Sequence, residues 1–277
     1  MQTGSTAHPH PQPLSHPGEG SRALVSLRGV KKTFANGTTA LAGLDLDIHP
    51  GEFVSLLGPS GCGKSTALRI LAGLIDASAG RVDWPGSGAD ADHRGEIGFV
   101  FQEPTLMPWA SVADNVWLPL RLRGVSRGAA QATIDECLDL VGLSGFHRSY
   151  PRELSGGMKM RVSIARALSL KPKLLLMDEP FAALDEITRF RLNDDLLLLQ
   201  RDFGCTVVFV THSVYESVYL SSRIVVMAAR PGRVVAEIAV EAPRERDEEF
   251  RTTPLYADLC REASQALHGA MAPDEHL

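Results

Sequence analysis

Short apolar runs separated by stretches of helical periodicity follow one another along most of the chain. Four of these runs have strand length and are apolar almost throughout: FVSLL, IGFVF, LLLMD and TVVFV. Strands of this kind are typical of a sheet covered by helices on both faces. Just before the last run, Leu192, Leu196, Leu199 and Phe203 recur at helical spacing. The pattern therefore predicts an α/β fold with a mostly parallel sheet.

Both ends of this pattern predict antiparallel strands instead. Near the N-terminus, ALVSLRGVKKTF and LAGLDLDIHP flank a short turn, and the second segment alternates apolar with acidic positions. Near the C-terminus, IVVMAARPGRVVAEIAV predicts a hairpin around Arg230 to Arg233. Between these ends, the sequence SAGR around Gly80 predicts a turn. The segment from Trp84 to Gly95 is rich in Gly and Asp and predicts a surface loop.

A long helical block interrupts the α/β pattern. Ser111 followed by Asp114 is typical of a helix start, and Ile134, Leu138 and Val141 share one helical face further along. The block predicts a helical subdomain inserted at about residues 103–170. We expect one domain over residues 22–242, followed by a charged tail over 243–277 that contains a short helix.

Residues 1–21 are rich in Pro, His, Gly and Ser, which predicts a disordered tail. Its three histidines alternate with prolines, and a solvated tail and metal binding both stay open for them. The four cysteines are widely spaced and form neither a metal pattern nor a disulfide framework, which suits a reducing, cytoplasmic compartment. No apolar run approaches membrane-spanning length, and no signal region is visible.

The overall composition is that of a soluble globular protein. Of the 277 residues, 44% are hydrophobic and 22% are charged. The net charge of -5 and the pI near 6.0 lack the basic bias of nucleic-acid binding proteins. We therefore expect no nucleic-acid partner.

The stretch GPSGCGKST fits the phosphate-binding pattern G-x-x-x-x-G-K-[ST] and lies between an apolar strand and an apolar helix. Its glycines let successive backbone N–H groups point at phosphate oxygens. Lys64 adds a positive charge, and the Ser65 hydroxyl is a ligand that suits Mg²⁺. An ordinary Gly-rich turn is the alternative interpretation. The candidate cofactor-binding residues here are Gly58, Pro59, Ser60, Gly61, Cys62, Gly63, Lys64, Ser65 and Thr66.

Two further stretches carry candidate chemistry. The strand LLLMD delivers Asp178 and Glu179 at its carboxyl end, where open α/β sheets bind ligands. There Asp178 can hold the Mg²⁺ shell, and Glu179 can accept a proton from an attacking water. In ELSGGMKMRV, Ser155, Gly156 and Gly157 open a helix and form a second anion site, or else a simple helix cap.

These motifs resemble those of the ATP-hydrolysing subunit of ABC transporters, over nearly the whole length from about Leu24 to Val240. GPSGCGKST, the glutamine of VFQEP, LSGGM, LLLMDEP, AALD and the histidine of VTH occur in the order of that family. The resemblance implies an ATPase with a P-loop NTPase core, an N-terminal antiparallel β subdomain and an inserted α-helical subdomain. Its cofactors would be ATP and Mg²⁺.

The resemblance also implies a role for each matching residue. Phe34 would stack on adenine, although core packing stays open for it from spacing alone. Ser65 and Gln102 would ligate Mg²⁺, with Asp178 as a metal-site residue that orients its water shell. The catalytic residues would be Lys64, Glu179 as general base, and His212 at the γ-phosphate; spacing alone also allows a structural role for His212.

In that family two chains enclose two ATP molecules in a head-to-tail dimer. Ser155, Gly156 and Gly157 would close over ATP bound to the second nucleotide-binding subunit, and Asp185 would lie across the interface. Met158 and Ala182 replace a frequent Gln and Ser of the family, but neither change removes a backbone phosphate contact. We therefore expect an active ATPase. A homodimer and a pairing with a paralogue both stay open.

Three sequence stretches resemble the nitrate, sulfonate and taurine importer subfamily, which includes pyrimidine-precursor uptake systems. They are FQEPTLMPWASVADNV, LSGGM and MDEPFAALDEITR. The resemblance implies a subunit at the cytoplasmic face of the membrane, bound peripherally to transmembrane permease subunits and served indirectly by a solute-binding protein. The solute itself is not encoded in this chain. Trp109 and Trp117 suit either a groove for the permease or the core of the subdomain.

Other functions have weaker support. A non-transport ABC ATPase acting in DNA repair or on ribosomes would carry a long coiled-coil insertion or a second nucleotide domain, and this chain has neither. A P-loop kinase or GTPase would lack LSGGM. A regulatory module without hydrolysis would not need Glu179.

Overall fold

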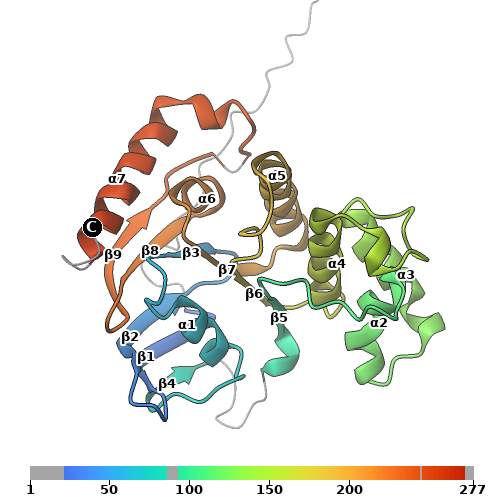
Figure 1. Ribbon diagram of the computed structural model, residues 1–277, viewed down its shortest axis with the longest axis horizontal. Helices are drawn as coiled ribbons and strands as arrows, with labels where there is room; N and C mark the ends of the chain where they lie inside the picture. The colour runs from blue at the N-terminus through green and yellow to red at the C-terminus, as the bar shows by residue number, and fades with distance from the viewer. Residues whose placement is uncertain (1–21, 86–92, 244, 272–277) are drawn as a thin grey trace, which may run out of the picture.

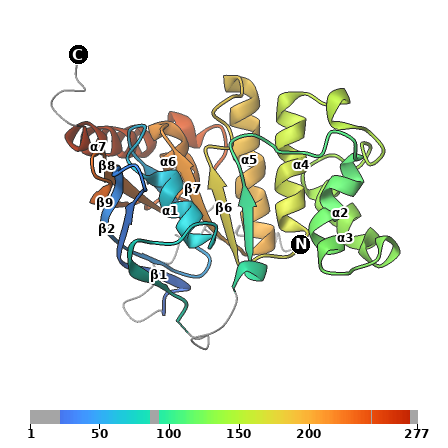
Figure 2. The same cartoon turned by 60° about the horizontal axis from the view of Figure 1, so that its bottom comes forward.

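The computed structural model describes residues 22–85, 93–243 and 245–271. The predicted N-terminal tail (1–21), most of the predicted surface loop and the last six residues lie outside this described part. Figures 1 and 2 show a central sheet with the antiparallel β region at one side and a group of helices at the other.

The central sheet has six strands in the order β5 (Ile97–Val100), β6 (Leu174–Asp178), β7 (Thr206–Thr211), β3 (Phe53–Leu57), β8 (Arg223–Ala228) and β9 (Arg233–Ala239). All neighbours pair in parallel except β8 and β9, which form the antiparallel hairpin that the sequence predicts. The α/β fold class with a mostly parallel sheet is therefore confirmed.

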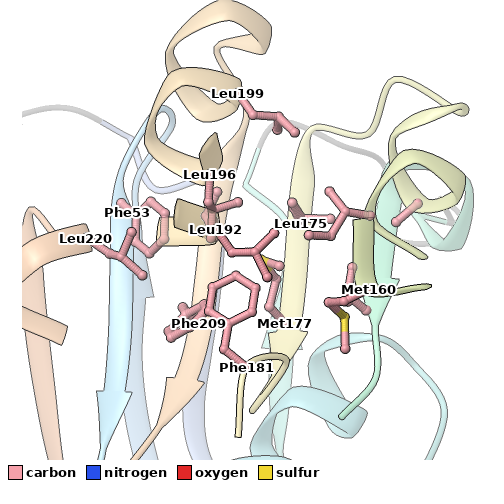
Figure 3. Packing of buried hydrophobic residues seen from close by; sticks show 14 of the residues in the cluster. Phe53, Met160, Leu175, Met177, Phe181, Leu192, Leu196, Leu199, Phe209 and Leu220 are labelled. Atoms are coloured by element: carbon pink, nitrogen blue, oxygen red, sulfur yellow. The ribbon is translucent and has the colours of Figure 1, made fainter. Parts of the chain in front are cut away.

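Both faces of this sheet are buried, which explains the apolar strands. Phe53 and Leu57 of β3 belong to one core cluster, and Val54 and Leu56 belong to the other. Because successive side chains of a strand point to opposite faces, an uninterrupted apolar run can supply both cores. Figure 3 shows the first core, with labelled residues from β3, β6, β7 and the helices above them.

The helices that cover the sheet follow from their apolar stripes. Those helices are α1 (Lys64–Leu71), α5 (Glu186–Phe203), α6 (Val214–Leu220) and α7 (Pro254–Ala270). In α5, Leu192, Leu196 and Leu199 are buried, as the helical spacing predicts. The predicted helical tail is α7, whose inward face buries Tyr256, Leu259, Cys260 and Ala263.

The smaller antiparallel sheet has the order β2 (Thr39–Ile48), β1 (Val25–Thr33) and β4 (Ala79–Asp83). The predicted β1 and β2 pair is confirmed. The predicted turn around Gly80 is wrong, because this segment is β4 and pairs with β1. A Cβ at Gly80 would lie 2.4 Å from the Gly29 oxygen, so two glycines allow a close, irregular pairing that looks like a turn in the sequence.

The inserted helical block consists of α2 (Val112–Leu122), α3 (Arg127–Leu140) and α4 (Gly156–Leu168), which lie beyond β5 in Figures 1 and 2. Ser111 accepts a hydrogen bond from the Asp114 N–H at 3.1 Å, so the predicted start of α2 is confirmed. Three short 3₁₀ turns complete the described chain: η1 (Arg94–Glu96), η2 (Pro151–Glu153) and η3 (Phe250–Thr252).

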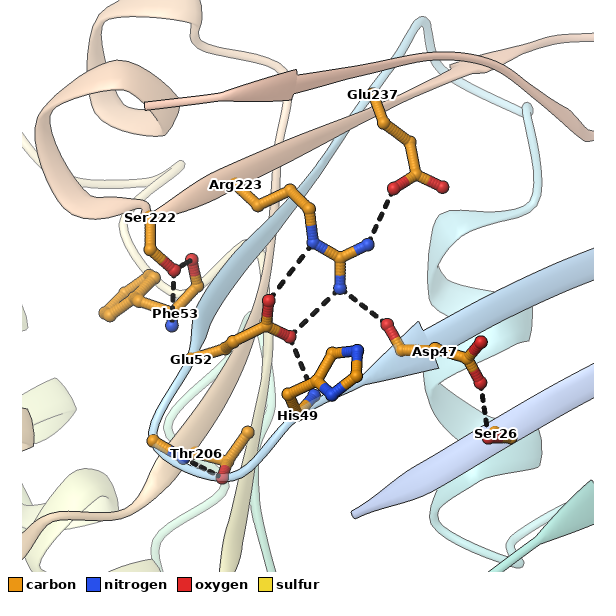
Figure 4. A network of polar contacts seen from close by, with 10 residues as sticks. Ser26, Asp47, His49, Glu52, Phe53, Thr206, Ser222, Arg223 and Glu237 are labelled. Atoms are coloured by element: carbon orange, nitrogen blue, oxygen red, sulfur yellow. Dashed lines mark hydrogen bonds and ion pairs between the residues drawn. The ribbon is translucent and has the colours of Figure 1, made fainter. Parts of the chain in front are cut away.

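A polar network ties the amino ends of β3 and β8 to the antiparallel sheet (Figure 4). The Arg223 guanidinium donates to Glu52 Oε2 at 3.0 Å and to Glu237 Oε2 at 2.7 Å. It also donates to the backbone carbonyl oxygen of Asp47 at 2.5 Å. Glu52 also accepts from the His49 N–H at 2.7 Å. These contacts keep the pKa of Arg223 above its usual range despite its burial. The network fixes how the two sheets meet.

Candidate active site

The predicted site residues meet at one edge of the central sheet. The phosphate loop follows β3, Asp178 ends β6, and His212 follows β7. Because these strands are parallel and lie side by side in the order β6, β7, β3, their carboxyl ends share one edge. Ligands of open α/β sheets bind at this edge.

The phosphate loop is packed so closely that two of its glycines have no room for a side chain. A Cβ at Gly58 would lie 2.5 Å from the Met227 oxygen, and one at Gly63 would lie 2.7 Å from the Ala40 oxygen. Gly63 also has a φ of 91°, which side chains rarely tolerate. Gly61 has a φ of 79° without a close neighbour. The loop therefore has the tight turn that a phosphate cradle needs.

Lys64 is buried within this loop and is held by the loop's own backbone. Its Nζ donates to the Gly58 oxygen at 2.7 Å and to the Pro59 oxygen at 3.1 Å. The nearest carboxylate oxygen, Oε1 of Glu179, is 3.9 Å away. The ammonium group thus lies at the loop without a close ion pair, so its charge is available to a phosphate.

Ser65 and Asp178 place two oxygen ligands side by side. The Ser65 hydroxyl donates to Asp178 Oδ1 at 2.6 Å, and Arg69 Nη2 lies 4.0 Å from the other carboxylate oxygen. Burial raises the pKa of Asp178, and the Ser65 hydrogen bond opposes this rise. Hydroxyl and carboxylate oxygens are ligands that Mg²⁺ accepts, so this pair fits the predicted metal site.

Glu179 lies between the phosphate loop and β7 in a strained backbone conformation. Its φ is 46°, uncommon for a residue with a side chain. Its N–H donates to the Val210 oxygen at 3.1 Å, and its carbonyl accepts from the Ala182 N–H at 3.2 Å. Its Oε2 is 3.4 Å from His212 Nδ1. The backbone bonds thus aim the carboxylate between the lysine and the histidine.

Behind His212 lies a polar group that the sequence did not reveal. The Thr211 hydroxyl donates to Glu216 Oε2 and accepts from the Ser213 N–H at 3.0 Å. Arg189 Nε is 3.4 Å from Glu216 Oε1. Burial is the largest influence on the Glu216 carboxyl and raises its pKa. The only sequence signal was a glutamate that follows VTH within four residues.

The LSGGM stretch and the AALD turn pack against each other. Ser155 accepts a hydrogen bond from the Met158 N–H at 3.3 Å, and Asp185 caps α5 through the Thr188 N–H at 2.9 Å. This capping lowers the pKa of Asp185. A Cβ at Gly157 would lie 2.7 Å from Thr188 Cγ2. Within the described residues, no hydrogen bond or ion pair joins either stretch to Lys64 or Asp178 of the same chain.

The remaining candidates lie at the surface. Phe34 is 41% exposed, with Lys32 Nζ 5.5 Å from its ring centroid, so the core-packing interpretation of Phe34 is wrong. Gln102 is exposed two residues beyond the end of β5. Trp109 is 77% exposed, whereas Trp117 packs against the core and donates to the Val125 oxygen at 3.1 Å. The sequence allowed either a groove or the core for both tryptophans. In the structure Trp109 is exposed and Trp117 is packed.

Together the fold and the phosphate loop at this edge of the sheet define a P-loop ATPase. The ABC transporter family model matches residues 41–182, and the chain belongs to this family. It is an ATP-binding subunit of an ABC transporter, as the ordered motifs predict. Within the described residues, no helix is both long and apolar enough to cross a bilayer.

Named relatives and solved structures agree with this assignment. The chain is 44% identical over 250 residues to an aliphatic sulfonates import ATP-binding protein of Pseudomonas savastanoi pv. phaseolicola, covering 90% of this chain and 98% of the relative. It is 43% identical over 239 residues to a protein of the same name from Bacillus licheniformis, covering 85% and 91%.

Two solved structures share the fold. An ATP-binding cassette dimer in a post-hydrolysis state with ADP and phosphate is 36% identical, with a TM-score of 0.69, and the match covers 79% of this chain and 99% of that one. CbiO1 of Clostridium perfringens, part of an ABC transporter complex, is 26% identical, with a TM-score of 0.72 and coverage of 88% and 98%. ATP binding by this chain follows from its family.

Proposed function

We propose that this chain hydrolyses ATP to drive a bacterial importer, with Glu179 as the general base. The observation that carries the proposal is the position of the Glu179 carboxylate, 3.9 Å from Lys64 Nζ and 3.4 Å from His212 Nδ1. In the chain, Lys64 directly precedes Ser65 and Glu179 directly follows Asp178, and these two neighbours are hydrogen-bonded to each other. One carboxylate thus faces a phosphate-binding cation and a histidine at the edge of the sheet where phosphates bind.

Each residue has a defined task in this proposal. Backbone N–H groups of residues 58–66 and Lys64 bind the phosphates of ATP, and Phe34 stacks on the adenine. Ser65, Gln102 and Asp178 hold Mg²⁺, which neutralises phosphate charge when bound. Glu179 takes a proton from the water that attacks the γ-phosphorus, while the bond from that phosphorus to the ADP oxygen breaks. His212 contacts the γ-phosphate and helps to position the attacking water.

The site is completed by a second nucleotide-binding subunit. Ser155, Gly156 and Gly157 form an anion site that has no described contact with the phosphate loop of its own chain. A head-to-tail dimer would bring this site and Asp185 to ATP on the partner, and the solved cassette dimer supports such an assembly. ATP then favours the closed dimer, and hydrolysis releases it.

The transported solute and the location come from the relatives. Both named relatives are import proteins for aliphatic sulfonates, which supports uptake of a sulfonate, taurine, nitrate or a related small solute over a role in DNA repair or on ribosomes. The subunit would lie at the cytoplasmic face of the membrane, bound to a permease that receives the solute from a binding protein.

A Glu179→Gln substitution tests the ATPase assignment. We expect steady-state ATP turnover to fall by about 10²- to 10⁴-fold, because general-base catalysis contributes that much. Size exclusion should show an ATP-dependent dimer for this variant, since binding is retained and hydrolysis is blocked. Glu186→Gln, on the first turn of α5, is the matched control. Turnover like that of the unmodified chain, or equal dimer fractions with and without ATP, would refute the proposal.

A Trp109→Ala substitution tests the permease contact. A large aromatic side chain that is 77% exposed suits an interface, where truncation of an anchor often costs about 2 kcal/mol or more. We expect loss of permease co-purification and transport, with ATP turnover of the isolated chain unchanged. The exposed Leu122, 80% accessible on the same subdomain, provides the control as Leu122→Ala. Unchanged co-purification and transport for Trp109→Ala would exclude this contact.

A further inference from the structure

The side chain of His212 lies mostly in solvent, although the proposed reaction needs it in one place. Its side chain is 56% exposed, and its Nδ1 is 3.4 Å from Glu179 Oε2. Because more than half of the side chain faces solvent, packing around the ring contributes little to this position. The backbone turn that carries His212, between β7 and α6, must therefore fix it.

Both chain neighbours of His212 are hydrogen-bonded to Glu216. The Thr211 hydroxyl donates to Glu216 Oε2, and the Glu216 N–H donates to the Ser213 hydroxyl at 3.3 Å. The Thr211 hydroxyl also accepts from the Ser213 N–H at 3.0 Å. One glutamate thus closes a ring of hydrogen bonds around the turn, and the histidine lies at the centre of that turn.

The carboxylate of Glu216 is buried, which makes it a costly choice for this position. Glu216 is 7% exposed, and burial raises its pKa. Arg189 offsets part of the cost, because its Nε is 3.4 Å from Glu216 Oε1. Arg189 is itself held, since its Nη2 donates to the Leu184 oxygen at 3.1 Å. A charged acceptor gives the Thr211 hydroxyl a stronger hydrogen bond than a neutral one would.

Glu216 and Arg189 also lie close to the proposed general base. One small space, of about 10 Å³, is lined by these two residues and by Glu179, Ala182, Thr211 and His212. A space of this size holds one water molecule at most. A shift of the turn at Glu216 would therefore change the gap between His212 and Glu179.

We infer that Glu216 is a positioning residue for ATP hydrolysis. It fixes the turn from Thr211 to Ser213, so that the His212 imidazole stays beside the Glu179 carboxylate. The inference rests on the proposed roles of Glu179 and His212. It adds a residue that acts through the two neighbours of the histidine and not on ATP itself.

Thr211→Val and Thr211→Ser are a matched pair of variants, because valine keeps the branched shape without the hydroxyl and serine keeps the hydroxyl. We expect kcat for ATP to fall by about 10- to 100-fold in Thr211→Val, since a misplacement of about 1 Å can cost that much. KM should stay within about threefold, because the phosphate loop is unchanged. Thr211→Ser should recover kcat. Equal kcat for the two variants, in a chain whose His212→Ala variant has lost turnover, would overturn the inference.

Substitutions of Glu216 separate positioning from stability. Glu216→Ala should lower kcat by about tenfold or more. Glu216→Gln should recover kcat, because the amide still bonds the Thr211 hydroxyl, even though Arg189 loses its carboxylate and the melting temperature falls. Ser217→Ala is the control, since it removes a hydroxyl of α6 that donates to the Val214 oxygen at 2.8 Å. It should lower the melting temperature and leave kcat unchanged. If kcat follows the melting temperature in all three variants, the role of Glu216 is structural and the inference fails.

Histidine labelled with ¹³C at Cε1 reports the position of His212 without nucleotide, and the loss of its signal in His212→Ala identifies it. We expect Glu179→Gln to move this signal in the unmodified chain and in Thr211→Ser, because the carboxylate is 3.4 Å from Nδ1. In Thr211→Val the same substitution should move it by less than about half as much. No movement in the unmodified chain, or equal movement in both Thr211 variants, overturns the inference. The measurement needs no hydrolysis, so its outcome is independent of whether Glu179 is the general base.

Discussion

The two ends of the central sheet hold similar charged residues in different arrangements. At the amino ends, Arg223 donates at 2.5 to 3.0 Å to the backbone carbonyl of Asp47 and to the carboxylates of Glu237 and Glu52. At the carboxyl ends, Lys64 and Glu179 are 3.9 Å apart. Buried charges are expensive unless they are paired and hydrogen-bonded. The first group satisfies itself, whereas the second is arranged to receive a ligand.

This difference indicates which end is structural and which is functional. The Arg223 network lies where β3 and β8 begin and joins the two sheets (Figure 4). Lys64, by contrast, is held by loop carbonyls, and the strained backbone of Glu179 directs its carboxylate at the same edge. Strain and incomplete pairing at a site are consistent with selection for binding and catalysis over stability.

The largest expected effect comes from Lys64→Met. We expect ATP turnover to fall by at least about 10²-fold, because a positioned charge that stabilises phosphate is lost. The free energy of unfolding should fall by about 1–3 kcal/mol, because the hydrogen bonds of Lys64 to two loop carbonyls are lost but no close ion pair is broken. ATPase assays and urea titration of the same preparation measure both. A large stability loss with turnover intact would reverse the comparison between the two ends.

The opposite result is expected for Glu52→Leu. Removing one partner of a buried ion pair costs about 3–5 kcal/mol, and we expect the lower end of this range because Arg223 keeps the exposed Glu237 and the Asp47 carbonyl as partners. ATP turnover per folded molecule should stay the same, since Glu52 precedes β3 and the phosphate loop follows it. Urea titration gives the stability and an ATPase assay gives the turnover.

Glu237→Gln is the control for this prediction. Glu237 contacts the same arginine, but its side chain is 44% exposed, and exposed pairs contribute about 0–1 kcal/mol. Equal stability losses for both variants would show that burial does not decide the strength of the Arg223 network.

The sequence predicted the central sheet well because its strands are buried on both faces and leave an unmistakable apolar pattern. It missed β4, since two facing glycines replace the side-chain alternation that marks a strand. Spacing also could not separate the exposed Trp109 from the packed Trp117, because exposure depends on how α2 lies against its neighbours.

The phosphate loop was predicted from the spacing of its own residues, and Asp178 and Glu179 from their place at the end of a strand. The role of His212 came only from the family resemblance. Four of the predicted residues, Lys64, Asp178, Glu179 and His212, lie at one edge because parallel strands end there. The Thr211, Glu216 and Arg189 group was not predicted, because its members come from β7, α6 and α5 and meet only in the folded chain. The roles of Phe34, Gln102 and Asp185 at ATP stay predictions.

The smallest expected effect on stability is that of Asp178→Asn, which reverses the usual sign of a mutation. Burial raises the pKa of Asp178 in the folded chain, so the folded state holds its proton more tightly than the unfolded state does. Above the unfolded pKa, near 4, rising pH therefore weakens stability until the folded pKa is passed. The neutral amide avoids this cost and still accepts the Ser65 hydroxyl proton.

At pH 7 without nucleotide or Mg²⁺, Asp178→Asn should therefore melt at the same temperature as the unmodified chain or up to about 2 °C higher. Below pH 4 this gain should vanish, because the unmodified carboxyl is then protonated in both states. ATP turnover at pH 7 should nevertheless be lost, because the charged oxygen ligand is gone. Ser60→Ala, in the exposed part of the phosphate loop, controls for local perturbation of the loop. A lower melting temperature for Asp178→Asn at pH 7 would mean that this carboxylate stabilises the fold, as Glu52 does at the other end.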